Sequence, residues 1–278
     1  KRFNRRCAVK VFISADIEGV TGATNWNETD KAHADYTEYR EQMTAEVAAA
    51  CEGALSAGAT EIVVKDAHWT GRNLIASKLP RAVRLIRSWT LDPYSMMAGL
   101  DETFQAALMI GYHSRSGSDA SPLAHTLTDR VVYVKINDRD ASEFLINAYT
   151  AGWLAVPVVF LSGDAGICRD AQDFLPALST VAVMEGVGDA TSSIHPGLAV
   201  ERIRSSVEAA LRGDVSRCRV TMPPHFTSEV YFRLHTNARQ ASFFPGARLV
   251  RPHVVQFEAD DYFEVLRFFM FGISMTAG

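Results

Sequence analysis

An almost continuous apolar run over residues 9–15 constrains the fold of this chain more than any other stretch. Only Lys10 and Ser14 interrupt it, and two carboxylates, Asp16 and Glu18, follow closely. An uninterrupted apolar run is typical of a strand buried on both faces of a parallel sheet, because a half-exposed strand would alternate with polar residues. We therefore expect residues 9–15 to form an inner strand of an α/β protein.

Further apolar runs alternate along the chain with helix-forming stretches. Strands are predicted over residues 61–65, 106–110, 131–136 and 156–161, and helices over residues 36–57 and 142–154. Parallel strands need crossover connections, which are usually helices. The alternation therefore predicts a mostly parallel sheet flanked by helices, as in an αβα sandwich.

The last third of the chain predicts a smaller C-terminal α+β lobe. Strand-like runs occupy residues 229–234 and 249–257, and an aromatic-rich helix is expected near residues 260–271. We divide the chain into a basic N-terminal tail (residues 1–8), a large α/β domain (residues 9–195) and the smaller lobe (residues 196–278).

Ligand-type side chains follow several of the predicted strands. Asp16 and Glu18 are two residues apart, so both leave the end of the first strand on the same side. Two ionised carboxylates side by side destabilise each other's charged form, and the pair therefore requires a cation. In α/β sheets, sites form outside the carboxyl ends of the strands. The predicted metal ligands at that edge are Asp16, Glu18, His68, His113 and Glu143.

The types of these ligands indicate the metal and its number. Imidazole and carboxylate groups suit Zn²⁺. Three carboxylates around one Zn²⁺ leave a negative charge, whereas two zinc ions with a bridging hydroxide reach neutrality. We therefore predict two zinc ions per subunit, bridged by Asp16, which would activate a water and polarise a carbonyl. Glu143 taken alone is better explained as an acid that stabilises a helix start.

The composition limits the kinds of partner and the compartment. A formal net charge of −4 lacks the basic excess that nucleic-acid binding usually needs. No apolar run reaches the roughly 18–20 residues of a membrane span. The four cysteines have no CxxC spacing, which indicates free thiols in a reducing compartment. We expect a cytoplasmic protein without nucleic-acid or membrane partners, and we interpret the basic start as a tail.

Several short motifs occur in the order typical of one family of metallopeptidases. They are Ser14-x-Asp16-x-Glu18-Gly19, Asp66-x-His68, Gly111-Tyr112-His113, His125, and Glu143 followed by Asn147-Ala148-Tyr149. With this ordered set the chain resembles the M55 family of D-aminopeptidases, the DppA-like zinc peptidases. The resemblance covers about residues 10–164 and continues more weakly to about residue 270.

This resemblance implies a zinc aminopeptidase that removes N-terminal residues, favouring D-amino acids such as D-alanine, from short peptides. It assigns two zinc ions to the five predicted ligands and a nucleophile-type catalytic role to His125. It also implies a ring-like homo-oligomer, for which a decamer is one candidate size. For His125 we weigh a role as general acid/base or oxyanion donor above covalent attack, because an imidazole beside two metals more usually acts that way.

Two other functions and the roles of three neighbouring residues stay open. The chain is alternatively a metal-dependent amidohydrolase acting on a non-peptide amide, or a non-catalytic binding protein that keeps the fold. Asp66 and Asp164 either orient a histidine of the site or hydrogen-bond their own loops. Lys65 stands where the family resemblance leads us to expect asparagine, and a lysine near a cationic centre costs energy unless it points away.

Overall fold

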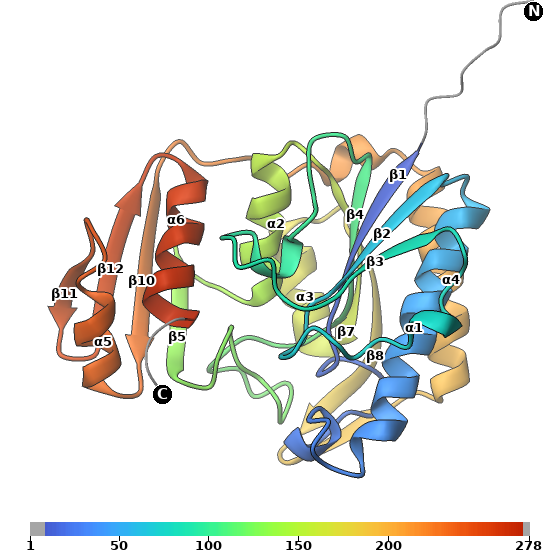
Figure 1. Ribbon diagram of the computed structural model, residues 1–278, viewed down its shortest axis with the longest axis horizontal. Helices are drawn as coiled ribbons and strands as arrows, with labels where there is room; N and C mark the ends of the chain where they lie inside the picture. The colour runs from blue at the N-terminus through green and yellow to red at the C-terminus, as the bar shows by residue number, and fades with distance from the viewer. Residues whose placement is uncertain (1–8, 275–278) are drawn as a thin grey trace, which may run out of the picture.

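The structure is a computed structural model that describes residues 9–274, so the predicted tail over residues 1–8 lies outside the described residues. A seven-stranded sheet has the order β3-β2-β1-β4-β7-β8-β9. Its strands are β1 (Lys10–Ala15), β2 (Glu61–Asp66), β3 (Val83–Ile86), β4 (Ala106–Tyr112), β7 (Val158–Asp164), β8 (Ser179–Val187) and β9 (Ala190–Ser193). Neighbours pair in parallel except β8 and β9, so the predicted mostly parallel sheet is confirmed (Figure 1).

The apolar run at the start of the chain forms the inner strand β1. Val11 pairs with Ile62 of β2 on one side and with Ala106 of β4 on the other. Phe12 and Ile13, which point to opposite faces, are both fully buried. Burial of a side chain of this size stabilises the fold by about 1.5–3 kcal/mol, which explains why this run fixes the middle of the sheet.

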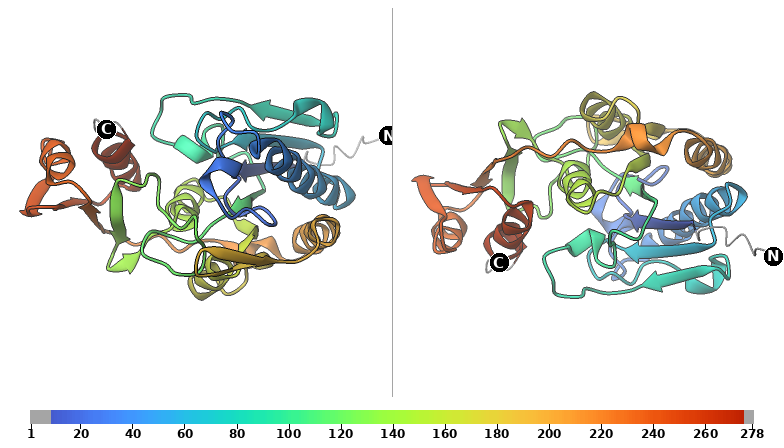
Figure 2. Two further views of the ribbon diagram at one scale, coloured as in Figure 1. Left: turned by 90° about the horizontal axis from the view of Figure 1, so that it is seen from below. Right: turned by 90° about the horizontal axis from the view of Figure 1, so that it is seen from above.

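Helices cover both faces of the parallel sheet. They are α1 (Tyr36–Ser56), α2 (Glu143–Trp153), α3 (Ala165–Phe174) and α4 (Pro196–Arg212). The helices α1 and α4 pack side by side on one face, and α2 and α3 lie on the other (Figure 2). This arrangement confirms the predicted αβα sandwich.

A second, antiparallel sheet has the order β11-β12-β10-β5-β6. Its strands are β5 (Val131–Ile136), β6 (Arg139–Asp140), β10 (Phe226–Phe232), β11 (Arg248–Arg251) and β12 (Val254–Ala259), with α5 (His235–Ala241) and α6 (Tyr262–Phe269) packed on it. The Tyr262 hydroxyl donates to the Ile146 carbonyl of α2 over 2.8 Å, which joins the two layers. Short helical turns complete the fold: η1 (Trp26–Glu28), η2 (Ala76–Lys78), η3 (Ser95–Met97), η4 (Val215–Cys218) and η5 (Met270–Ser274).

The antiparallel part differs in one detail from what the chain predicted. Residues 249–257, expected as one strand, form the two strands β11 and β12, because the chain turns at Pro252, which has no N–H to donate.

The division of the chain at residue 196 stays a prediction. The helix α4 packs on α1 in the large layer, and β5 from the middle of the chain pairs with β10.

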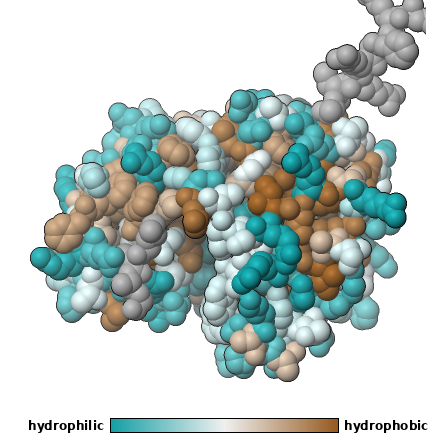
Figure 3. Space-filling model, viewed as in Figure 1, coloured by the Kyte–Doolittle hydropathy of each residue, from teal (hydrophilic) through white to brown (hydrophobic). Residues whose placement is uncertain are grey.

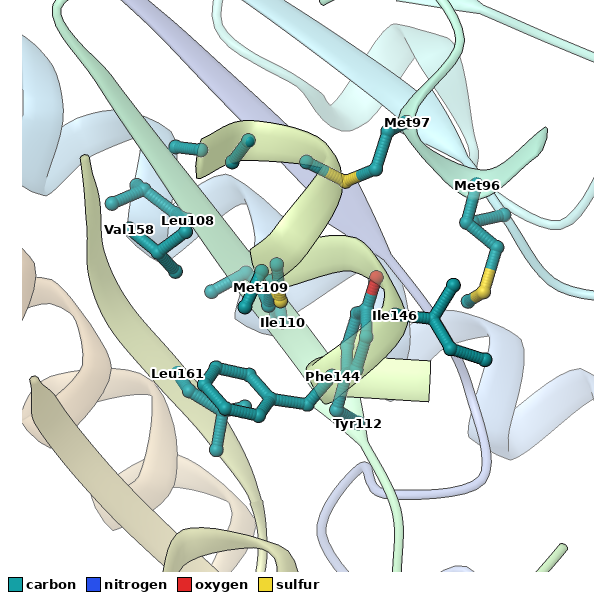
Figure 4. Close-up of a cluster of buried hydrophobic side chains, with 14 of the residues drawn as sticks. Met96, Met97, Leu108, Met109, Ile110, Tyr112, Phe144, Ile146, Val158 and Leu161 are labelled. Carbon is teal, nitrogen blue, oxygen red and sulfur yellow. The ribbon is translucent and has the colours of Figure 1, made fainter. Parts of the chain in front are cut away.

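The contact between α2 and the parallel sheet contains a buried chain of polar groups. Apolar side chains from α2, β4 and β7 lie around Tyr112, one of its members (Figure 4). The Asn147 amide donates to the Tyr112 hydroxyl over 2.8 Å, and that hydroxyl donates to Ser14 Oγ over 2.8 Å. Ser14 in turn donates to the Met96 carbonyl over 2.9 Å. This Ser14–Tyr112–Asn147 chain ties β1, β4 and α2 together.

The surface is polar over most of the face seen in Figure 1. Apolar residues gather over the sheet edge formed by β2 and β3 (Figure 3), where Val83, Leu85 and Ile86 are only partly buried. Within residues 9–274, no helix combines the length and the apolar character needed to cross a membrane.

Candidate metal centre

The five predicted ligands gather at the carboxyl edge of the parallel sheet. Asp16 and Glu18 follow β1, His68 follows β2, His113 follows β4, and Glu143 is the first residue of α2. None of the five is more than 6% exposed. The structure thus brings all of them into one buried cluster, which we call the carboxylate–histidine centre.

Asp16 lies between the two histidines of the centre. Its Oδ1 is 3.4 Å from His68 Nδ1, and its Oδ2 is 3.5 Å from His113 Nε2. One carboxylate oxygen therefore faces each imidazole, which is the geometry that a bridging carboxylate needs.

Glu18 and Glu143 each accompany one of the histidines. Glu18 Oε1 is 3.0 Å from His68 Nδ1, and Glu143 Oε2 is 3.4 Å from His113 Nε2. The candidate ligand atoms of Asp16, Glu18 and His68 lie within 4.8 Å of one another, and so do those of Asp16, His113 and Glu143. The ligand atoms of Glu18, His113 and His125 form a third such group. The first two groups share Asp16, and we call them the two half-sites.

Backbone carbonyls set which nitrogen of each histidine faces the carboxylates. His68 Nε2 lies 3.0 Å from the Thr29 carbonyl, and His113 Nδ1 lies 3.0 Å from the Ser114 carbonyl. Since a carbonyl oxygen can only accept, each of these nitrogens carries the proton, and the other nitrogen offers a lone pair to the half-site. Thr29 was not identified from the sequence, because it lies in the loop after η1 and contributes only its backbone.

Glu143 is positioned by the cap of its helix and by a hydrogen bond to its side chain. The Ser142 side chain accepts from the Leu145 N–H over 3.2 Å and thereby caps the start of α2. Glu143 Oε1 accepts from the Leu127 N–H over 2.7 Å, which leaves Oε2 facing His113. The two interpretations of Glu143 are thus compatible, because the residue is both a helix-start acid and a member of the centre.

Two buried polar atoms of the centre lack a hydrogen-bond partner. They are Glu18 Oε2 and His113 Nε2. A buried polar group without a partner costs about 1–3 kcal/mol, and more when it is charged. A carboxylate oxygen and an imidazole lone pair are both zinc ligands, so the residues present fit a pair of zinc ions.

The electrostatics of the centre show the same need for positive charge. Burial and the neighbouring charge of Glu18 raise the pKa of Asp16 well above its usual range. Burial opposes protonation of His68, but the charge of Glu18 and hydrogen bonds from the imidazole to both carboxylates outweigh it and raise the His68 pKa. Without cations to balance the three carboxylates, proton binding to Asp16 and His68 is favoured instead.

His125 stands at the outer side of the centre. Its ring stacks on His113 with 4.2 Å between ring centroids and 6° between planes. Its Nε2 is 3.8 Å from Glu143 Oε1 and 4.0 Å from Glu18 Oε1, and its Nδ1 is 2.9 Å from the Leu123 carbonyl. Burial and the nearby His113 lower the pKa of His125, so this imidazole is neutral near pH 7. A neutral imidazole there can accept or return a proton at Nε2.

A cavity of about 490 Å³ opens beside His125, and we call it the outer cavity. Trp26 in its wall meets the His125 ring edge to face, with 5.1 Å between centroids. Val131 and Arg233 bring the antiparallel sheet into the same wall. The cavity is thus lined by residues next to the centre, including His125, and by residues of the antiparallel sheet.

Asp66 and Asp164 hold loops and do not contact the histidine rings. Asp66 accepts from the backbone N–H and the side chain of Asn73, whose amide also donates to the His68 carbonyl. Asp164 accepts from the Ser114 N–H and hydroxyl and from the Ile167 N–H at the start of α3. Asp66 therefore hydrogen-bonds its own loop, as one of the two predicted roles requires. Asp164 bonds the start of α3 and also the loop after β4, which was not predicted.

Lys65 turns its amine away from the centre. Its Nζ donates to the Asp66 and Ser88 carbonyls and lies 4.2 Å from the centre of the Trp89 ring. Burial lowers the pKa of Lys65 to about 8. A lysine at this position is therefore compatible with a metal centre at the end of the same strand.

Gly19 lets the loop after Glu18 pass close to the end of β4. Its N–H donates to the Gly111 carbonyl over 2.9 Å, and a Cβ at Gly19 would lie 1.7 Å from the Tyr112 carbonyl oxygen. Only glycine fits such an approach. This contact holds the Glu18 loop against the strand that carries His113.

Replacing Gly19 with alanine is expected to destabilise the metal-free protein by at least about 1–3 kcal/mol, because the backbones must move apart. Thermal or urea unfolding would measure the change. Gly213→Ala is the control, since Gly213 has φ −77° and its nearest atom would be 3.3 Å from a new Cβ. Equal effects of the two substitutions would show that the close approach does not explain Gly19.

Comparisons with known proteins agree on one family. The family model described as D-aminopeptidase, peptidase M55, matches residues 9–271. A D-aminopeptidase from Bacillus subtilis (strain 168) is 31% identical over 258 residues, which is 92% of this chain and 93% of that relative. The solved structure of the Zn-dependent D-aminopeptidase DppA from Bacillus subtilis, a self-compartmentalizing protease, matches with a TM-score of 0.91 and 29% identity. This match covers 96% of this chain and 98% of that one.

Proposed function

This chain belongs to the peptidase M55 family of D-aminopeptidases, and from that premise we propose that it is a zinc-dependent aminopeptidase. Its substrates are short peptides, from which it removes N-terminal residues of D configuration. The observation that carries the proposal is the pair of half-sites sharing Asp16, with unpartnered ligand atoms on Glu18 and His113.

Asp16, Glu18, His68, His113 and Glu143 are the proposed ligands of two zinc ions. Zinc bound there would act as a Lewis acid toward the scissile carbonyl and lower the pKa of a water. Backbone groups prepare the centre for this: the Thr29 and Ser114 carbonyls fix the histidine tautomers, and the Leu127 N–H orients Glu143. A preorganised ligand set of this kind loses little free energy on binding metal.

His125 is the proposed general acid/base. Its Nε2 faces the space beside Glu18 and Glu143, and its Nδ1 is fixed by the Leu123 carbonyl. A neutral imidazole in this position can take up a proton from the water that attacks the peptide carbonyl. It can then give this proton to the leaving amine as the C–N bond breaks. If the free α-amine of a peptide binds at the carboxylate–histidine centre, its first peptide bond lies beside His125. This would explain why the enzyme removes the N-terminal residue instead of cleaving internal bonds.

Turnover of a substrate panel tests the function directly. The zinc-loaded protein is expected to release D-alanine from D-alanyl dipeptides much faster than L-alanine from L-alanyl dipeptides, and EDTA is expected to abolish both reactions. Elemental analysis should find about two zinc ions per chain. Failure to cleave any aminoacyl substrate would overturn the proposed aminopeptidase function. Cleavage of non-peptide amides alone would then indicate an amidohydrolase, and bound zinc without turnover would indicate a binding protein.

The proposal includes a homo-oligomer, because the matching Bacillus subtilis structure is described as self-compartmentalizing. The partly exposed apolar edge at β2 and β3 provides surface that assembly would bury. A ring of ten subunits and a cytoplasmic location both stay predictions.

A further inference from the structure

The outer cavity lies beside the carboxylate–histidine centre, because His125 lines the cavity and its Nε2 is 3.8 Å from Glu143 Oε1. We propose that this cavity binds the part of the peptide that follows the scissile bond, and that Arg233 binds the peptide's C-terminal carboxylate. The inference rests on the proposed aminopeptidase function and adds to it a preference for short peptides with a free carboxyl end.

The direction of the bound peptide follows from the position of His125. Its Nε2 points toward Glu18 and Glu143, where the peptide bond is attacked, while the same ring forms part of the cavity wall. If His125 protonates the leaving amine, the residue that carries this amine must lie on the His125 side of the bond. The chain beyond that amine then enters the outer cavity.

Arg233 supplies positive charge to the wall of the cavity. It follows β10, and its N–H donates to the Arg130 carbonyl over 2.8 Å, which places it beside the start of β5. Its side chain is exposed, and within residues 9–274 no acidic group forms an ion pair with it. A guanidinium group binds a carboxylate through two parallel hydrogen bonds, so Arg233 offers a site for the end of a peptide.

The other charge in the wall opposes this binding. Asp129 is exposed and accepts a weak hydrogen bond of 3.4 Å from the Thr128 hydroxyl. Its negative charge repels a peptide carboxylate that does not reach Arg233. The two residues therefore make opposite contributions, and their substitutions should change carboxylate binding in opposite directions.

The size of the cavity matches a short peptide. A sphere of about 490 Å³ is roughly 10 Å across. The two residues that follow the first peptide bond of a tripeptide span at most roughly 7 Å, which leaves room for a carboxylate and its hydrogen bonds. Val131, Val132 and Trp26 give the wall apolar surface against which small side chains can pack.

The experiment compares D-alanyl-glycyl-alanine with its C-terminal amide. The wild-type enzyme is expected to favour the free carboxylate by about tenfold in kcat/KM, mainly through KM, as a charge-assisted hydrogen bond would give. In Arg233→Gln the ratio should fall to about one, Arg233→Lys should retain part of it, and Asp129→Asn should raise it. Arg239→Gln is the matched control, because Arg239 lies on α5 over the Phe243 ring and outside the cavity wall.

A binding measurement separates failure of this inference from failure of the proposed function. Calorimetric titration of zinc-loaded His125→Ala with the peptide and with its amide requires no turnover. Tighter binding of the carboxylate that disappears in His125→Ala/Arg233→Gln would support the Arg233 site even if the wild type cleaved neither compound. A carboxylate preference that is absent from the wild type, or is unchanged by Arg233→Gln, would overturn it.

Discussion

Replacing His125 with alanine is expected to lower kcat for D-alanyl peptides by roughly 100- to 10,000-fold, the usual contribution of a general acid/base. The zinc content should stay the same, because His68 and His113, not His125, lie closest to the shared Asp16. Steady-state kinetics together with elemental analysis of the same preparation would measure both quantities.

The pH dependence of the variant adds a second criterion. Burial and His113 lower the pKa of His125, so the acidic limb of the wild-type kcat profile that reports this group should lie below the usual histidine range. That limb should be missing from the residual activity of His125→Ala. His33→Ala serves as the control, since the His33 side chain is 47% exposed and pairs with Asp30. Unchanged turnover in His125→Ala would remove the catalytic assignment.

Replacing Asp16 with asparagine is expected to empty both half-sites instead of one. Each oxygen of Asp16 faces a different histidine, so removing its charge weakens both ligand sets at once. The loss of zinc affinity should exceed the roughly 10- to 100-fold that removal of an outer-shell partner costs. Elemental analysis after dialysis should find less than about one zinc per chain, and activity should fall with the metal content.

The metal-free form provides the matching structural test of Asp16→Asn. Asparagine keeps the shape of the side chain and its acceptor for the Ile17 N–H, which is 2.9 Å from Oδ1. It also relieves repulsion from Glu18, which contributes to the raised pKa of Asp16. The metal-free variant should therefore unfold at a temperature equal to or above that of metal-free wild type. Asp173→Asn, at an exposed acid paired with Arg139, is the control. Two tightly bound zinc ions in Asp16→Asn would exclude Asp16 as the bridge.

Much of the large layer was predictable because its signals are local. A short, almost continuous apolar run rich in β-branched residues is typical of a buried strand, and β1 formed where residues 9–15 predicted it. The clustering of Asp16, His68 and His113 followed from a general property of parallel sheets, whose strand ends meet at one edge. No knowledge of the strand order was needed for that inference.

The parts that the sequence did not predict depend on contacts between distant segments. The strand β5 looks like any other strand in the sequence, and only its pairing with β10, almost a hundred residues later, places it in the antiparallel sheet. The roles of the Thr29 and Ser114 carbonyls left no signal at all, because a backbone carbonyl has no residue type. The outer cavity was not predicted either, because its lining residues, such as Trp26 and Arg233, are far apart in the sequence and come together only in the folded chain.

The Ser14–Tyr112–Asn147 chain has a consequence for the rigidity of the candidate metal centre. It joins β1, β4 and α2, the three elements next to or carrying Asp16, His113 and Glu143. One of these elements cannot shift relative to the other two without breaking buried hydrogen bonds. A rearrangement of the backbone beneath the proposed ligands would therefore require a cooperative opening of the sheet edge. The backbone positions of three proposed ligands are thus fixed relative to one another before any ion binds.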